Sequence, residues 1–200
     1  MKTKSGNSSV KTLLIIVAVG FCFSLFGNIL LYSINNQIST TLNDQKMLVV
    51  ENIAFSLESL SYLPVPGPLA RDEYSNISIV EISNRHIVYH ADYGRASVQQ
   101  LITLDSAHGK NLTQIDKLFV SFGVFADNLD RLVSENKTSN AIELIDGFSK
   151  NMSDLPTGLG SKLKSAYSKA TTDEGELELA LEQATQIQAL LDSMTLLPPE

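Results

Sequence analysis

The sequence has no tryptophan and only one cysteine, Cys22, among its 200 residues. A single cysteine cannot form an intrachain disulfide, so a domain stabilised by internal disulfides is excluded. Glycine and proline are also scarce, at 11 and 6 residues. With an apolar content of 44%, this composition is typical of a globular chain that forms long helices around one core.

Charge is missing from a long segment near the N-terminus, because no Asp, Glu, Lys or Arg occurs from residue 12 to residue 43. Residues 12–34 read TLLIIVAVGFCFSLFGNILLYSI. About 22 helical residues rise roughly 33 Å, which matches the hydrocarbon thickness of a bilayer. A buried helix of a soluble protein would carry a polar stripe over this length. The segment therefore predicts a transmembrane helix over residues 12–34.

Two other uses of this segment are less favoured. A cleaved signal peptide has a shorter apolar region followed by small residues at the cleavage site, and the residues after Tyr32 offer poor small-residue positions. Lipidation of Cys22 would require a small side chain where Phe21 stands. We favour an uncleaved signal anchor over both.

The basic residues predict the orientation of this anchor. Lys2, Lys4 and Lys11 precede it, whereas only Lys46 lies within about 15 residues after it. The positive-inside rule then predicts a short cytoplasmic tail over residues 1–11 and an extracytoplasmic domain over residues 35–200. We expect a single-pass protein of the cell membrane.

Apolar residues recur at helical spacing beyond the anchor. The pattern continues from Ile34 to Leu60 and stops at the prolines of residues 64–68. Residues 70–105 fit a helix better than a hairpin, although a hairpin over 76–93 stays open. Further breaks at 106–110 and 153–160 and a helix cap at Thr172 complete an all-α prediction: the transmembrane helix continues into an antiparallel helical bundle of about four main helices.

Two histidines form the best candidate for a metal site. His86 and His90 are four residues apart, so they share a face on a helix and also on a strand. A metal would need a third ligand, such as Asp92 or a carboxylate from another helix. The more ordinary reading is two half-exposed histidines beside tyrosines, so His86 and His90 are weak candidates and we expect no cofactor.

Motifs of catalysis and nucleic-acid binding are missing. The sequence contains no G-x-S-x-G, no H-E-x-x-H and no P-loop, so we expect no enzymatic activity. All 22 acidic residues follow the uncharged segment, and the net charge is −7. A domain with this balance repels nucleic acid.

Small and polar residues within the anchor define a candidate helix–helix interface, namely Gly20, Ser24, Gly27 and Asn28. Small residues allow two membrane helices to approach closely, and a buried amide seeks a partner across such an interface. A plain lipid-facing role for the small residues is the alternative.

An N-terminal anchor that leads into a helical bundle resembles the extracytoplasmic sensory half of bacterial transmembrane receptors with four-helix-bundle ligand domains. Such receptors need a second membrane helix to send a signal inward, and we find none in the sequence. We therefore expect a sensor-like binding or accessory module that contacts membrane lipid and acts through a protein partner, a self-dimer or a small molecule. The alternative is a structural or assembly protein that acts through helix–helix self-association.

Overall fold

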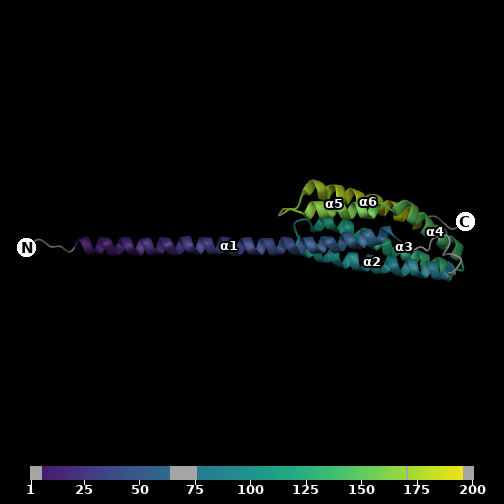
Figure 1. Cartoon of the computed structure of the whole chain (residues 1–200), viewed down its shortest axis with the longest axis horizontal. Helices are drawn as coiled ribbons and strands as arrows, with labels where there is room; N and C mark the ends of the chain where they lie inside the picture. The colour runs from purple at the N-terminus through teal and green to yellow at the C-terminus, as the bar shows by residue number, and fades with distance from the viewer. Residues whose placement is uncertain (1–5, 64–75, 170, 196–200) are drawn as a thin grey trace, which may run out of the picture. The chain divides into compact units, whose positions relative to one another are not determined.

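The computed structural model describes residues 6–63, 76–169 and 171–195, and it is all-helical without a strand over these residues. The all-α prediction is therefore confirmed, and residues 76–93 are helical as favoured over the hairpin. Figure 1 labels the six helices in chain order: α1 Gly6–Ser61, α2 Asn76–Leu104, α3 Gly109–Ser134, α4 Thr138–Met152, α5 Leu155–Tyr167 and α6 Glu174–Thr195.

The chain divides into two compact units, Met1–Leu42 and Asn43–Glu200. In the first unit, every side chain from residue 16 to residue 41 is exposed. Among the described helices, α1 alone contains a stretch that is long and apolar enough to cross a membrane. One long apolar N-terminal helix is therefore present where the sequence predicts it.

One hydrophobic core holds the second unit together. The last part of α1 contributes Val50, Ile53 and Leu57, which are fully buried. These residues share one face of the helix because they are separated by three or four positions. Matching apolar faces of α2 to α6 complete the same cluster.

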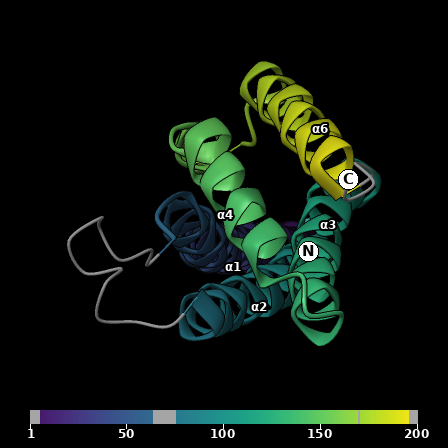
Figure 2. The same ribbon diagram turned by 90° about the vertical axis from the view of Figure 1, so that its right-hand side faces the viewer.

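The helices of the second unit pack both on their neighbours in the chain and on helices farther along it. Helix α2 packs on α3, α3 packs on α6, and α5 packs on α6, while α4 contacts α2, α3 and α6. Figure 2 shows α2, α3, α4 and α6 of this arrangement, and Figure 1 shows α5 beside α6. Helix α3 buries a row of phenylalanines in the centre: Phe119, Phe122 and Phe125.

Two glycines permit close helix contacts. A methyl group at Gly160 of α5 would come within 3.1 Å of the Cα and Cβ atoms of Ala54 in α1. A methyl group at Gly94 of α2 would overlap the ring of Phe119. A larger residue at either position would separate two packed elements.

Three details of the sequence prediction differ from the structure. The described residues form six helices rather than about four main ones, because the chain after α3 forms three separate helices. The predicted break at residues 153–160 is wrong for residues 155–160, since α5 begins at Leu155. Pro156 stands in the first turn of α5, where its missing N–H is tolerated. The prediction of a Thr172 cap is wrong, since Asp173 Oδ1 accepts the backbone N–H of Glu176 at 3.3 Å.

Candidate functional site

Exposed apolar side chains gather on the outer edges of α1 and α2 in the second unit. Helical spacing of seven and four residues places them along one edge of each helix. Leu48 and Phe55 of α1 are 60% and 56% exposed, and Tyr89 of α2 is 63% exposed. We call this surface the aromatic face and define it by six residues: Leu48, Phe55, Tyr62, Ile82, Tyr89 and Tyr93.

Ring contacts join the two helices at the centre of the aromatic face. The ring of His90 lies 5.8 Å from that of Phe55 and 5.0 Å from that of Tyr89, edge to face in both cases. The ring of Tyr89 stacks parallel to that of Tyr93 at 6.4 Å. Aromatic pairs at such distances stabilise each other beyond their buried area, so these side chains form a preorganised surface.

The two predicted histidines lie on one face of α2, as their spacing predicts. The ring centroids of His86 and His90 are 4.5 Å apart. His86 Nε2 donates a hydrogen bond to the backbone oxygen of Ser59 at 2.8 Å. Among the residues that the structure describes, no group of three His, Cys, Asp or Glu side chains is placed to hold a metal ion. His86 therefore joins α2 to α1, because it forms this hydrogen bond to Ser59.

His90 is the more buried member of the pair, with 8% of its surface exposed. Its Nδ1 atom is buried and has no hydrogen-bond partner among the described residues. Burial and, to a smaller extent, the nearby His86 lower the pKa of His90. Both effects disfavour the charged imidazolium, so His90 acts as a neutral aromatic side chain beneath the aromatic face.

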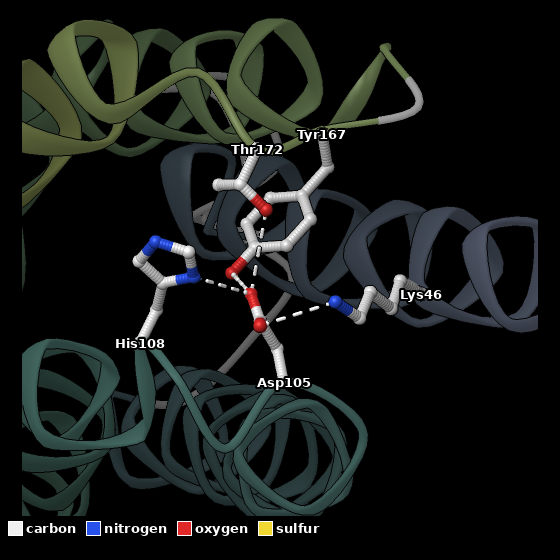
Figure 3. A network of polar contacts seen from close by, with 5 residues as sticks. All are labelled: Lys46, Asp105, His108, Tyr167 and Thr172. Atoms are coloured by element: carbon white, nitrogen blue, oxygen red, sulfur yellow. Dashed lines mark hydrogen bonds and ion pairs between the residues drawn. The ribbon is translucent and has the colours of Figure 1, made fainter. Parts of the chain in front are cut away.

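A second polar cluster, which the sequence does not reveal, surrounds Asp105 at the end of α2 (Figure 3). The Asp105 side chain is 4% exposed. Asp105 Oδ1 lies 3.1 Å from Lys46 Nζ of α1, and Asp105 Oδ2 accepts a 2.8 Å hydrogen bond from Tyr167 of α5. Asp105 Oδ2 also contacts His108 Nδ1 at 2.9 Å and Thr172 Oγ1 at 3.5 Å.

The donors around Asp105 outweigh the cost of burying its charge. Burial alone would raise the pKa of this carboxyl, but hydrogen bonds from Tyr167, Lys46 and His108 hold the pKa below its ordinary value. Burial and the adjacent Asp105 carboxylate raise the pKa of Tyr167. Asp105 is therefore ionised and Tyr167 is protonated at neutral pH, which is the state that the hydrogen bonds require.

The Asp105 cluster joins four separate segments of the second unit. Lys46 belongs to α1, His108 to the turn before α3, Tyr167 to α5 and Thr172 to the connection before α6. Charged hydrogen bonds are stronger than neutral ones and demand a defined geometry. Through Asp105, the cluster therefore connects Lys46, near the start of the second unit, with the turn before α3 and the connection before α6. Both carboxylate oxygens of Asp105 therefore have partners within the second unit.

The predicted anchor interface lies in the first unit. Gly20, Ser24, Gly27 and Asn28 are helical and exposed. Methyl groups at Gly20 and Gly27 would meet no other atom within 4 Å. A role of these four residues in helix pairing stays a prediction.

Comparison with known proteins gives no relative from which a role can be inferred. No protein family model, no curated protein and no solved structure matches this chain.

Proposed function

We propose that this chain is a membrane-anchored binding or accessory module whose second unit is an antiparallel helical bundle outside the cytoplasm. In this proposal the module is sensor-like, has no catalytic activity and contacts a protein partner through the aromatic face. The observation that carries the proposal is the aromatic face itself, where large apolar side chains stay exposed on α1 and α2. Contiguous exposed apolar surface on a folded domain is typical of an interaction site.

The composition of the aromatic face supports a protein partner over a small ligand. Tyrosine and phenylalanine are enriched at the centres of protein–protein interfaces, where they provide large contact area at low entropic cost. Phe55, Tyr89 and Tyr93 are supported from below by His90 or by one another. A surface held in place before binding loses less entropy when a partner docks.

The first unit supports the membrane part of the proposal. Its side chains from residue 16 to residue 41 are exposed, although most of them are apolar. Exposed apolar surface of this extent is unfavourable in water and favourable in lipid. Lys2, Lys4 and Lys11 on its N-terminal side favour an orientation with the second unit outside the cytoplasm.

A structural or assembly role is the second candidate function. It is favoured by the spacing of Leu48 and Phe55 on the exposed edge of α1 and of Tyr62 directly after the helix, which recur every seven residues. A seven-residue apolar repeat is the pattern by which helices associate side by side. In this case the aromatic face would bind other helices of the same assembly.

Site-specific photocrosslinking in the native membrane tests the binding role. A photoreactive amino acid at Phe55 reports on the aromatic face, and the same amino acid at Val124, which is 51% exposed on α3, is the matched control. The proposal predicts one discrete heavier adduct from position 55 and none from position 124. Equal adducts from both positions, or none from position 55, would contradict it. Mass spectrometry of the adduct then identifies the protein that is bound.

A further inference from the structure

Charged residues border the aromatic face on both helices. On α1, exposed acids alternate with the exposed apolar residues at intervals of three or four positions, which keeps them on one edge of the helix. On α2, Arg85 and Asp92 lie four and three positions from Tyr89, and Glu81 lies four positions from Arg85. We call these exposed charged residues the rim and define it by six residues: Asp44, Glu51, Glu58, Glu81, Arg85 and Asp92.

The rim is acidic, since five of its six residues are Asp or Glu. None of the six forms an ion pair among the residues that the structure describes. Two neighbouring bases pair with other acids: Lys46 lies 3.1 Å from the buried Asp105, and Arg95 lies 3.3 Å from Asp116 of α3. The aromatic face therefore carries a surplus of negative charge along its edges.

Exposed apolar residues on α3 have a different border. Val120 and Val124 are 40% and 51% exposed. Lys117, three positions before Val120, and Asp127, three positions after Val124, are exposed and carry opposite charges. An acidic border is therefore not a general property of exposed apolar residues in the second unit.

The spacing on α1 suits a helix as the partner. Acids recur every seven residues at positions 44, 51 and 58, and apolar residues do so at positions 48 and 55. A second helix that lies alongside α1 has the same rise per residue, so one apolar and one basic position in every seven residues match this pattern along its length. An extended strand rises about 3.3 Å per residue, against about 1.5 Å for a helix, and would not keep this register.

We infer that the aromatic face binds a cationic amphipathic helix of a different protein. The apolar side chains of this helix lie on Phe55 and Tyr89, and its Lys or Arg side chains lie beside the acids of the rim. Amphipathic helices bind to apolar surfaces of other proteins through their apolar face. The inference rests on the proposed function and deepens it, because it gives the chemistry of the protein partner.

The charge of the rim disfavours other occupants of the aromatic face. A second copy of this chain brings the same surplus of acids to the rim, and anionic lipid headgroups also bring negative charge. Like charges weaken association, whereas complementary charges raise the rate of encounter and select the partner. A basic amphipathic helix is favourable both for the apolar residues of the aromatic face and for its acidic rim.

Charge reversal on the rim tests the inference. Photocrosslinking from position 55 is carried out in isolated native membranes that contain the full-length protein. Glu51→Lys combined with Glu58→Lys is expected to lower the adduct yield about tenfold, because two attractions become repulsions. Glu178→Lys combined with Glu182→Lys changes the same number of exposed charges on α6 and is expected to leave the yield within about twofold.

Two further measurements do not depend on the lysine variants. Arg85→Glu removes the base of the rim and is expected to raise the adduct yield about threefold. Raising the salt concentration from about 0.05 M to about 0.5 M is expected to lower the wild-type yield, because exposed charges are screened. Glu51→Gln combined with Glu58→Gln keeps the size of the side chains and is expected to reduce this salt dependence. Circular dichroism of each purified variant checks that its helices are intact.

The crosslinked segment of the partner identifies its chemistry. Mass spectrometry is expected to find a segment with Lys or Arg at helical spacing beside apolar residues. An acidic segment, a segment from a second copy of this chain, or rim variants that lower the yield no more than the α6 variants would overturn the cationic helix. Each of these results would leave the aromatic face as a binding surface. No adduct from position 55 in the otherwise wild-type protein would overturn the proposed function and this inference together.

Discussion

Phenylalanines occur at similar spacings in the two units, but their surroundings are opposite. In the first unit, Phe23 and Phe26 are 75% and 66% exposed. In the second unit, Phe122 and Phe125 are fully buried. Residue type alone therefore does not determine whether a phenylalanine of this chain is buried. The residues that flank it in the helix determine this instead.

The flanking residues explain this difference. Helix α3 carries Asp116, Lys117, Asp127 and Asp130 between its apolar residues, so one side can face water while the other packs on the core. The first unit has no charged residue from 12 to 42, and apolar residues occur on every side of its helix from residue 16 to residue 34. A helix of that kind has no face suited to water, which is the physical basis for proposing that lipid surrounds it.

The largest expected effect comes from truncating matched phenylalanines in the two units. Phe122→Ala removes a fully buried ring and is expected to lower the free energy of unfolding of the second unit by about 3–5 kcal/mol. Phe23→Ala removes an exposed ring and is expected to leave that free energy unchanged. Denaturant unfolding of the full-length protein in detergent, followed by circular dichroism, provides the comparison. Equal losses from both variants would show that the two phenylalanines have similar surroundings.

A smaller loss of stability is expected when the ion pair between Lys46 and the buried Asp105 is broken. Lys46→Ala leaves the buried Asp105 carboxylate without its cation and is expected to cost about 3 kcal/mol. Lys117→Ala removes the same charge from an exposed position of α3 and is expected to change stability by less than about 0.5 kcal/mol. The same unfolding measurement applies. Similar values for the two lysines would mean that the Asp105 cluster contributes little.

The smallest effect is the dependence of stability on pH. The folded-state pKa of Asp105 is lowered, so the unfolded chain binds the proton more readily. The stability that Asp105 contributes is therefore complete above the ordinary carboxyl pKa and is lost as the pH falls through the lower, folded-state value. Between about pH 5 and about pH 2, wild type should lose more stability than Asp105→Asn. Parallel pH profiles of the two proteins would contradict this assignment.

Much of the fold could be predicted because proline and glycine interrupt otherwise regular apolar patterns. The break at residues 106–110 and the helical reading of residues 76–93 agree with the structure. The sequence does not distinguish Thr172 from Asp173 as the cap of α6, because the two residues are adjacent and both side chains can cap a helix, whereas in the structure Asp173 is the cap. Thr172 instead contacts Asp105, a long-range interaction that local patterns do not encode.

The candidate sites differ in how far sequence alone could predict them. Spacing was sufficient to place His86 and His90 on one face, because helical periodicity is a local property. The Asp105 cluster could not be predicted, since Lys46 and Tyr167 are distant in sequence and no motif joins them. The aromatic face could not be predicted either, because the helical spacing of apolar residues does not show which edge of a helix is exposed and which is buried.

The most direct test of the account is the side of the membrane on which the second unit lies. In a Cys22→Ser background, Leu179→Cys provides one thiol at a position of α6 that is 45% exposed. A membrane-impermeant maleimide is applied to intact cells that produce the full-length protein, and Ser5→Cys serves as the control for the N-terminal side. The account predicts that Leu179→Cys is labelled without lysis and Ser5→Cys only after lysis. Labelling of Leu179→Cys only after lysis would contradict it.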